Sequence, residues 1–575
     1  MGPIDAEALS GKLRTFLQTR VPHYMVPFAV VILEAMPLTP NGKINHKGLP
    51  APPKKAAMEK INALSKTEDV LVKLWAKLLS TSVTSVHDNF FELGGHSVLA
   101  TQLTLAVSRT FGVELPLTVL FTSPTISTMA SAIDSLVANH SSARKSIDLL
   151  QEAQLSLKIK ETDSLKRPED SCLSDPKVLL LTGATGFVGA FLLRDLLEMT
   201  KAERVYCLAR AKHDKAATKR VKKNLQAHLL WKESYESRIF GLSGDLSKPH
   251  LGVSIETWNT LCSEVDSIYH NGAVVHWLQP YEALKTTNVG GTNQVLVLAS
   301  SEKLKYVHYI STTNVFDTAH HKKQATVWED DQLHSYEGID GGYSQSKWVA
   351  EKMVMLARVK GIPVAIYRPG YITGDSKNGV WNIDDFLCRL CKGVIQMQAA
   401  PEMPEDTTID MCAVDYVSGS IVHISLNPFC IGKAYNITNP NLYKYNNLFN
   451  SIRSFGYPIT TVSYDTWREK LKEMASDNQS KEILALSPLV PFFTSTWPQS
   501  LKNPIYDISN VTKALEGSDI KCPTIQNLLT TYFSYFIQSG FVKPPQSAPN
   551  NNLNIDWNLI SEGVTMLTRS DRNNF

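Results

Sequence analysis

A tyrosine and a lysine four residues apart carry the clearest catalytic chemistry in this sequence. Tyr343 and Lys347 follow a Gly-Gly pair in a stretch that predicts a helix, so both side chains leave the same helix face. An ammonium group beside a phenol favours the phenolate, so we expect Lys347 to lower the pKa of Tyr343. Pairs with this spacing are common and usually structural, and the surrounding elements decide whether they transfer protons.

A glycine-rich turn upstream of this pair has the context of a nucleotide site. The apolar stretch 177–182 predicts a buried strand, and a predicted helix follows the turn. Glycines at this point let backbone N–H groups approach a pyrophosphate at the helix N-terminus. The candidate cofactor-binding residues in the turn are Gly183, Thr185, Gly186, Phe187, Val188 and Gly189.

The next predicted strand, 204–208, leads to an arginine where an NAD site would carry an acid. The guanidinium of Arg210 suits the 2′-phosphate of NADP, and Arg220, about three helical turns further on, is a second candidate. An ordinary surface arginine is the alternative at both positions. The sequence therefore predicts NADPH rather than NADH.

Apolar strands alternate with helices through the middle of the chain. Predicted strands 239–242, 265–269, 306–311 and 364–368 follow the two already named. This alternation is the doubly wound pattern and predicts an α/β Rossmann fold built on a parallel sheet. Residues 67–138 differ, because their apolar spacing predicts a small all-α bundle.

The helical bundle is expected to begin at Thr67, which would cap the first helix with Glu68 and Asp69 in its first turn. A second helix starts near Ser97, directly after an aromatic pair and a Gly-Gly turn. Read alone, Ser97 is a helix N-cap, the usual role of a serine at such a place. Its hydroxyl would then stand exposed at a helix start.

A resemblance to carrier proteins rests on the residues that lead to Ser97. They read Phe90-Phe91-Glu92-Leu93-Gly94-Gly95-His96-Ser97 and closely resemble the phosphopantetheine attachment site of peptidyl and acyl carrier proteins. In that family the serine carries a long thiol arm, and the arm carries a substrate as a thioester. The resemblance implies a four-helix carrier domain, 4′-phosphopantetheine on Ser97 and a phosphopantetheinyl transferase as a partner.

The Tyr343–Lys347 pair, the upstream glycine turn and a hydroxyl residue closing the preceding strand together resemble short-chain dehydrogenases/reductases. The resemblance implies that Thr312 binds the substrate oxygen, Tyr343 protonates it and Lys347 holds the nicotinamide ribose. Thr312 matches the Ser/Thr position best, although Ser311 and Thr313 are close enough to be alternative registers.

A later loop resembles the extended branch of the same family. The loop reads Pro369-Gly370-Tyr371-Ile372-Thr373-Gly374, and in that branch it borders the nicotinamide. The resemblance adds these candidate cofactor-binding residues: Asp245, Leu246, Asn271, Ala273, Tyr343, Lys347, Pro369, Gly370 and Ile372. A smaller substrate lobe is expected after the loop.

The first fifty residues resemble the end of a different enzyme. Pro37-Leu38-Thr39-Pro40-Asn41-Gly42-Lys43 is similar to the last motif of the adenylate-forming domains of peptide synthetases. The family's lysine contacts the acyl-adenylate, and Lys43 matches it; the alternative is a hairpin with an exposed lysine. So short a segment cannot form the nucleotide pocket, so we expect it to be inactive and most of an upstream adenylation domain to be absent.

Together these parts predict the following order. We expect an adenylation-domain remnant at 1–50, a linker at 51–66, a carrier domain at 67–138, a linker with room for one helix at 139–176, the NADP-binding part of a reductase at 177–375, its substrate lobe at 376–545 and a tail at 546–575. The two linkers and the tail rest on their Pro-, Lys-, Ser- and Asn-rich composition.

A carrier followed by an extended reductase resembles the terminal thioester reductases of peptide synthetases, carboxylic acid reductases and fungal α-aminoadipate reductases. The resemblance to the last is strongest, through Gly244-Asp245-Leu246-Ser247-Lys248 and His270-Asn271-Gly272-Ala273-Val274-Val275-His276-Trp277 among other stretches. It implies NADPH-dependent reduction of an aminoadipyl thioester to the 6-semialdehyde, a step of lysine biosynthesis.

Four alternatives stay open at this point. The chain could be the terminal reductase of another peptide synthetase or carboxylic acid reductase. The second alternative is a sugar-nucleotide epimerase or dehydratase, although such an enzyme would have no use for a fused carrier. A domain that cyclises its substrate without a reductant would not need Tyr343 or an intact glycine turn. A non-catalytic carrier scaffold with a dead reductase would not bind NADPH.

Composition narrows the class of protein further. The formal net charge of +3 is too small to argue for nucleic acid or an anionic membrane. No apolar run approaches the ~18 residues of a membrane span, and no signal peptide is recognisable. Among eight scattered cysteines, Cys388 and Cys391 form the one C-x-x-C pair, and we expect small core residues rather than a metal site. Reduced thiols indicate a cytoplasmic protein.

Overall fold

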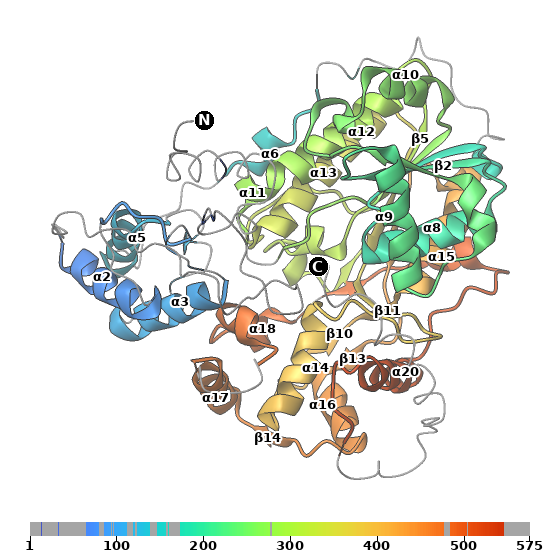
Figure 1. Ribbon diagram of the computed structural model, residues 1–575. Helices are drawn as coiled ribbons and strands as arrows, with labels where there is room; N and C mark the ends of the chain where they lie inside the picture. The colour runs from blue at the N-terminus through green and yellow to red at the C-terminus, as the bar shows by residue number, and fades with distance from the viewer. Residues whose placement is uncertain are drawn as a thin grey trace. The chain divides into compact units, whose positions relative to one another are not determined.

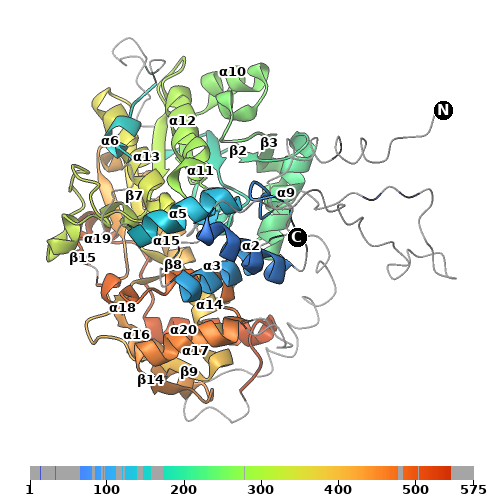
Figure 2. The same ribbon diagram turned by 90° about the vertical axis from the view of Figure 1, so that its left-hand side faces the viewer.

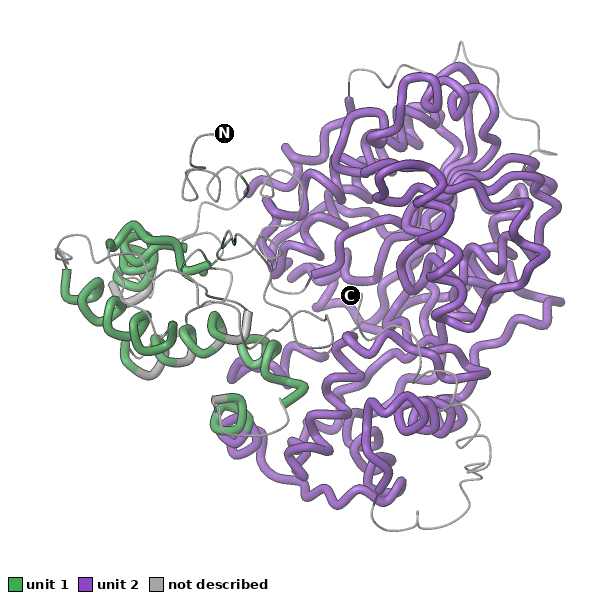
Figure 3. Tube along the Cα trace, viewed as in Figure 1, with its two compact units in different colours: residues 1–145, 471–492 green, residues 146–470, 493–575 purple. Residues whose placement is uncertain are grey.

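The computed structural model describes residues 65–79, 85–138 with short gaps, 147–156, 159, 173–276, 279–476, 484–502 and 504–545, together with Leu13, Val31 and Leu33 (Figure 1). The chain divides into two compact units, residues 1–145 with 471–492 and residues 146–470 with 493–575 (Figure 3). Lys43 and the predicted tail 546–575 lie outside the described residues.

The first unit contains the predicted helical bundle. Its main helices are α2 (Lys66–Leu79), α3 (Ser97–Phe111) and α5 (Ile126–Ala138). Apolar side chains fill its centre, where the rings of Trp75 and Phe90 meet edge to face with centroids 5.1 Å apart. The expectation of a helical carrier region is confirmed.

The first helix of this bundle begins earlier than predicted. The Ser65 hydroxyl accepts a hydrogen bond from the backbone N–H of Glu68 at 3.1 Å, and the Glu68 carboxylate accepts one from the N–H of Ser65 at 3.0 Å. This reciprocal capping box satisfies two backbone donors at once. Ser65 therefore caps the helix, and Thr67 lies within it, donating to Asp134 at 2.5 Å.

The second unit is built on one seven-stranded parallel sheet with the order β12-β7-β5-β4-β1-β2-β3. The strands are β1 (Val178–Thr182), β2 (Arg204–Ala209), β3 (Ile239–Ser243), β4 (Ser267–His270), β5 (Tyr306–Ile310), β7 (Val364–Pro369) and β12 (Ala434–Ile437). Six fall on predicted strands, so the predicted α/β Rossmann fold is confirmed. The seventh, β12, has four residues and no neighbouring motif, and it was not predicted.

Helices cover both faces of this sheet (Figure 1). One group contains α8 (Phe187–Met199), α9 (Asp214–Ala227) and α15 (Val414–Ser425), in which α8 contacts both of the others. The other group contains α10 (Ile255–Glu264), α12 (Gly291–Ala299) and α13 (Gly342–Val359), in which α12 contacts both of the others. A large cluster of buried apolar side chains lies on the α12–α13 side of the sheet.

Residues 376–545 contribute to more than one part of the second unit. Strand β12 joins the main sheet, and α15 packs on α8. Helix α19 (Ser509–Leu515) contacts α15 and β12. Other elements form a smaller part (Figure 2). They include α14 (Phe386–Met397), α16 (Tyr445–Ser454), α18 (Trp497–Ser500) and α20 (Ile525–Gln538), and α17 (Tyr464–Ser476) lies where the chain passes from the second unit into the first.

The two cysteines of the C-x-x-C pair are buried in α14 and form no disulfide. Across the described residues, no group of three or more histidine, cysteine or acidic side chains is arranged to hold a metal ion. Within the same ranges, no helix has the length and apolar character needed to cross a membrane.

Candidate cofactor and catalytic site

The sheet brings the predicted site residues to one edge. The order of the strands reverses at β1, with β2 and β3 on one side and β4 and β5 on the other. Open α/β sheets bind ligands at the carboxyl ends of their strands at such a point. The glycine turn follows β1, Asn271 follows β4 and Thr312 follows β5, so the candidate cofactor and catalytic residues share this edge.

Close backbone approach makes two glycines of the turn necessary. Gly183 has a φ of +78°, and a Cβ there would lie 2.8 Å from the Cα of Gly272. A Cβ on Gly189 would lie 1.9 Å from the carbonyl oxygen of Gly183. The turn therefore leads directly into α8, whose first N–H groups can face a phosphate. Thr185, Phe187 and Val188 are partly exposed in this turn, and Gly186 is exposed.

A buried chain of hydrogen bonds joins the turn to β4. The Thr182 hydroxyl accepts from the N–H of Gly272 at 2.9 Å and lies 2.8 Å from Nδ1 of His270. Nε2 of His270 lies 3.0 Å from the hydroxyl of Thr292. Burial, helped by the charge of Lys347, lowers the pKa of His270 to about 3, so the imidazole is neutral. Neutral groups thus hold this side of the site.

Asn224, on α9, stabilises the glycine turn through hydrogen bonds to two of its carbonyl oxygens. Its Nδ2 donates to the carbonyl oxygens of Ala184 and Gly186, both at 3.0 Å. The sequence reading missed this residue, because a polar residue in a helix so far along the chain carries no local signal. Its position makes it a positioning residue for the turn.

Arg210 and Arg220 lie together at the end of β2. The guanidinium of Arg220 donates to the carbonyl oxygen of Arg210 at 2.5 Å, and both residues are exposed. Two arginines predicted separately therefore meet beside the strand end at which an adenosine ribose is expected. Their exposure leaves both side chains accessible to an anion from solution.

Of the candidate cofactor-binding residues after β3 and β4, one stabilises its own turn and two pack beside glycines. The Asp245 carboxylate accepts from the N–H and hydroxyl of Ser247, at 2.9 and 2.8 Å, and so stabilises its own turn. The side chains of Leu246 and Asn271 pack beside Gly272 and Gly183 respectively. Ala273 is partly exposed in the same loop.

Helix α13 carries the tyrosine and lysine to the end of β5. Tyr343 lies in its first turn and Lys347 one turn later. The Lys347 ammonium donates to the carbonyl oxygen of Ile310 at 2.8 Å and lies 4.4 Å from the centre of the Tyr309 ring. Thr312 begins the short helix η7 (Thr313–Phe316), which contacts α13.

The pKa of Tyr343 does not follow the sequence expectation. Burial raises it to about 12, because a desolvated phenolate is costlier than the phenol. The phenol is therefore protonated at neutral pH, which is the state that a proton donor needs. Burial lowers the pKa of Lys347 to about 7, and the negative charge of Glu351 opposes that shift.

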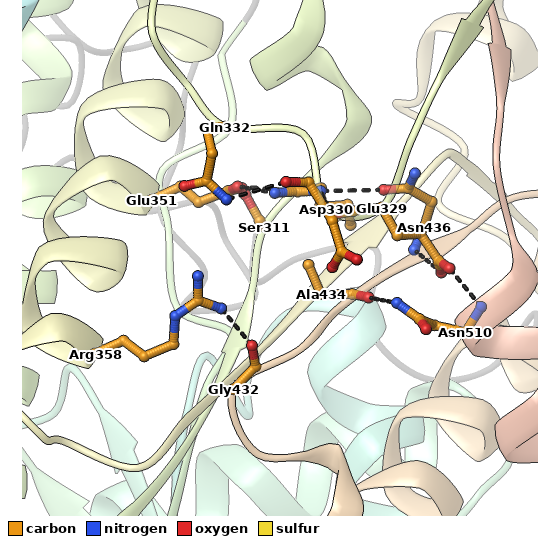
Figure 4. A network of polar contacts seen from close by, with 11 residues as sticks. Ser311, Glu329, Asp330, Gln332, Glu351, Arg358, Gly432, Ala434, Asn436 and Asn510 are labelled. Carbon is orange, nitrogen blue, oxygen red and sulfur yellow. Dashed lines mark hydrogen bonds and ion pairs between the residues drawn. The ribbon is translucent and has the colours of Figure 1, made fainter.

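Glu351 joins three segments at the edge of the sheet that carries the candidate catalytic residues (Figure 4). It lies one helical turn after Lys347, and its carboxylate accepts a hydrogen bond from the Ser311 hydroxyl. It also accepts from Nε of Arg368 at 2.9 Å, and both side chains of this ion pair are completely buried. The pair joins α13 to the ends of β5 and β7, and sequence reading missed it.

The same buried network continues toward the C-terminal part of the second unit. Arg368 donates from Nη1 to the carbonyl oxygen of Glu329 at 2.9 Å. The Glu329 carboxylate accepts from the N–H groups of Asn436 at 2.9 Å and Asn510 at 2.5 Å (Figure 4). Burial raises the pKa of Glu329 to about 7. Strand β12 and helix α19 are thereby connected to the catalytic strand ends.

Asn288 holds the loop after β4 against α13, the helix that carries the candidate residues Tyr343 and Lys347. Its Nδ2 donates to the hydroxyl of Ser346 at 2.9 Å and to the carbonyl oxygen of Val274 at 3.0 Å, and its Oδ1 accepts from the N–H of Val274 at 2.8 Å. Asn288 itself is 2% exposed. The loop that contains Asn271 is therefore held to α13.

The loop after β7 is tightly packed. Pro369 ends the strand, and a Cβ on Gly370 would lie 1.6 Å from Oδ2 of Asp410. Burial raises the pKa of Asp410 to about 7. Ile372 lies in the short strand β8 (Tyr371–Thr373), which pairs with β11 (Met411–Ala413). Only a glycine can occupy position 370 while Asp410 lies there.

Ser97 is the first residue of α3, as the sequence predicted. Family models match both units. The model described as "Phosphopantetheine attachment site" matches residues 69–133, and an NAD-binding family described as "Male sterility protein" matches residues 181–421. The first match covers the α2–α5 bundle, and the second covers the main sheet from β1 to α15.

Full-length relatives extend beyond this chain. It is 38% identical over 543 residues to a linear gramicidin synthase protein of Brevibacillus parabrevis, covering 94% of the chain and 11% of the relative. It is 34% identical over 602 residues to the L-2-aminoadipate reductase large subunit of Penicillium chrysogenum, covering 95% of the chain and 42% of the relative. The chain thus spans less than half the length of these relatives.

Solved structures agree with the fold. The terminal R domain of the myxalamid PKS-NRPS pathway is 39% identical, with a TM-score of 0.64, and the match covers 70% of this chain and 99% of that domain. A thiolation-reductase di-domain of an archaeal non-ribosomal peptide synthetase shares the fold at 20% identity, with a TM-score of 0.65 over 84% of this chain. With its phosphopantetheine attachment region followed by an NAD-binding reductase fold, the chain belongs to the family of carrier-linked terminal reductases that includes R domains of non-ribosomal peptide synthetases and the L-2-aminoadipate reductases.

Proposed function

We propose that this chain releases an acyl group from its own carrier by NADPH-dependent reduction of the thioester to an aldehyde. The observation that carries the proposal is the attachment of α13 to the end of β5. Lys347 binds the last carbonyl of that strand, and Ser311 binds Glu351, so Tyr343 and Thr312 lie at the same strand end. The reversal of strand order at β1 supports a nucleotide site beside them, because open α/β sheets bind ligands at such a point.

The backbone at this edge fits a dinucleotide. Gly183 and Gly189 leave room that a Cβ would fill, and α8 begins at the turn. Arg210 and Arg220 meet at the end of β2, where they would hold the 2′-phosphate. When bound, NADPH supplies a hydride to the thioester carbonyl. The fit supports NADPH rather than NADH.

The residues at the end of β5 bind the substrate oxygen, protonate it and orient the cofactor. As negative charge grows on the carbonyl oxygen, the Thr312 hydroxyl donates a hydrogen bond to it and Tyr343 protonates it. The phenol is available for this step, because its pKa of about 12 keeps it protonated. Lys347 orients the nicotinamide ribose, and cleavage of the carbon–sulfur bond frees the thiol of the arm on Ser97.

We propose 2-aminoadipate as the acyl group, with the 6-semialdehyde as product in lysine biosynthesis. The relatives named L-2-aminoadipate reductase support this choice. The 38% identity to a gramicidin synthase protein favours a second candidate, a peptidyl thioester at the end of a peptide synthetase. The proposed partners are an upstream adenylation domain and a phosphopantetheinyl transferase, and the proposed compartment is the cytoplasm.

Loading the carrier with defined acyl groups tests the proposal. A promiscuous phosphopantetheinyl transferase would attach aminoadipyl- or dipeptidyl-phosphopantetheine to Ser97 of the purified chain. NADPH oxidation and mass spectrometry of the product would then be followed in a single turnover. We expect aminoadipate semialdehyde from the first sample. Faster release of a peptide aldehyde would favour the second candidate, and absence of NADPH oxidation with every acyl group would refute reductive release.

A further inference from the structure

The segment that follows the carrier bundle is built into the core of the reductase. Residues 147–156 include the short helix α6 (Leu149–Glu152). Leu149 and Ala153 are 1% and 4% exposed and belong to the same apolar core as the α12 and α13 side of the sheet. Ile147 and Leu155 pack against that core from its margin. Apolar burial of this kind is what holds a segment in a folded unit.

Polar contacts fix the same segment to other elements. The Glu152 carboxylate accepts from the Tyr281 hydroxyl at 2.9 Å and pairs with the Lys285 ammonium at 2.6 Å, both on α11 (Tyr281–Lys285). The hydrogen bond from Lys285 is the largest cause of a lowered pKa for Glu152, and the hydrogen bond from Tyr281 lowers that pKa further. Asp148 caps α6 and accepts from the hydroxyl of Tyr336 at 3.3 Å.

Further contacts bring the segment beside the catalytic helix. The N–H of Ser156 donates to Oδ1 of Asn293, on α12, at 3.2 Å. Helix α6 contacts α13, the helix that carries Tyr343 and Lys347 (Figures 1 and 2). The boundary between the two compact units falls at residue 145, directly before this segment.

We propose that residues 147–156 with Ile159, called the anchor from here on, fix the start of the carrier tether on the reductase, so that eight residues, 139–146, separate the carrier bundle from it. The proposal rests on the proposed function, because the tether matters only if the carrier delivers a substrate to this reductase. Eight residues separate α5 from Ile147 and span no more than about 30 Å when fully extended.

Without the anchor the tether would be much longer. Ile159, 1% exposed in the same core, is the last residue of the anchor, and the next described residue is Leu173, so 34 residues would then separate α5 from the reductase. The effective concentration of a tethered group falls with about the −3/2 power of tether length once the tether exceeds the span it must bridge. Lengthening from eight to 34 residues lowers it about ninefold. The anchor therefore raises the rate of delivery without touching the substrate.

Two insertions of equal length, one on each side of the anchor, distinguish an anchored tether from a linker that is free along its whole length. A Gly/Ser segment of about 26 residues, which gives the length ratio used above, is placed between Ser141 and Ser142, upstream of the anchor, or between Lys166 and Arg167, downstream of it. The full chain carries the acylated arm, and NADPH oxidation is followed in a single turnover at low protein concentration. We expect the upstream insertion to slow carrier-bound reduction about fivefold to tenfold and the downstream insertion to change it less than twofold.

Releasing the anchor should remove this difference. The combined variant Leu149→Ala, Glu152→Ala, Ile159→Ala should slow carrier-bound reduction by itself, and the downstream insertion should then slow it about twofold more. Leu150→Ala with Gln151→Ala is the matched control, because both side chains are exposed on the same helix. Reduction of a free thioester that mimics the end of the arm should be the same in all variants.

Equal effects of the two insertions, including no effect of either, would overturn the proposal. Hydrogen exchange of residues 147–156 tests the anchor independently of activity. We expect these amides to be protected in the wild-type chain and to lose protection in the Leu149→Ala, Glu152→Ala, Ile159→Ala variant. If no thioester is reduced while this protection is present, the proposed function fails and the anchor stands; if the protection is absent, the anchor fails.

Discussion

The two halves of the site are held in different ways. On the nucleotide side, the glycine turn is fixed by steric approach and by neutral hydrogen bonds through Thr182, a neutral His270 and Asn224. On the catalytic side, α13 is fixed by a buried ion pair between Glu351 and Arg368. Neutral contacts change little with pH, whereas buried charges do. The contribution of the glycine turn to cofactor binding should therefore be nearly independent of pH near neutrality, whereas the contribution of Lys347 to binding, and turnover, should not be.

The largest expected effect separates catalysis from binding. Tyr343→Phe removes the proton donor and should lower the rate of reduction about 10²–10⁴-fold while the Kd for NADPH stays nearly unchanged. Single-turnover kinetics and fluorescence titration measure the two quantities. Lys347→Ala is the comparison, because it should damage both. Near-normal turnover in Tyr343→Phe would mean that another group protonates the substrate oxygen.

The next largest effect tests the buried ion pair between Glu351 and Arg368. Glu351→Gln leaves the Arg368 guanidinium buried without its counter-ion, which should lower the free energy of unfolding by about 3–5 kcal/mol. Lys347 should be cationic below its pKa of about 7, so activity should fall as pH rises through that value. Because Glu351 raises this pKa, its loss should move the fall in activity to lower pH.

Denaturant unfolding and a pH profile of kcat measure these two effects of Glu351→Gln. The exposed acid Asp330 lies in the same region, so Asp330→Asn is a control for simple loss of charge. A pH profile that stays in place while stability falls would show that Glu351 is structural only.

A smaller effect tests the expected 2′-phosphate site. Arg210→Ala should weaken NADPH binding about 10- to 100-fold, the worth of hydrogen bonds to a charged group, and leave NADH binding almost unchanged. Isothermal titration with both nucleotides measures the difference. Arg204→Ala removes the same charge from the other end of β2 and should affect neither. Equal weakening of both nucleotides by Arg210→Ala would remove Arg210 from this role.

The smallest expected effect concerns Asn224, whose side chain stabilises the glycine turn. Asn224→Ala removes two neutral hydrogen bonds, each worth about 0.5–1.5 kcal/mol to the turn; because the bound nucleotide also holds the turn, only part of this loss reaches binding, and the Kd for NADPH should rise by up to about tenfold. The shift should be the same at pH 6 and pH 8, in contrast to Glu351→Gln. Gln226→Ala, exposed on the same helix, is the control. A pH-dependent shift would show that the nucleotide side also depends on charge.

Local signals made most of the fold and part of the site predictable. The glycine turn, the Tyr343–Lys347 spacing and six apolar strands are each contained in a few consecutive residues. Glu351 and Asn224 gave no such signal, because each acts on residues about 40 positions away in the sequence. Their side chains look like ordinary polar helix residues until the sheet brings the partners together.

Burial is the property that the sequence could not supply at two places. The Tyr343–Lys347 spacing predicts a lowered pKa for Tyr343, because only the neighbouring lysine is visible in the sequence, whereas burial is a property of the folded unit and raises it. The segment 139–176, predicted as a linker with room for one helix, contains α6, and its Leu149 and Ala153 are buried in the core. Composition alone does not indicate that burial.

The central place of β1 has a consequence for synthesis on the ribosome. This strand is made first, but its second neighbour, β4, begins at Ser267, 85 residues after β1 ends. At about 5–20 residues per second, one edge of β1 waits roughly 4–17 s for its partner. An unpaired apolar edge is a template for pairing with another nascent chain. Slower elongation between β1 and β4 would therefore increase misassembly more than the same delay after β5.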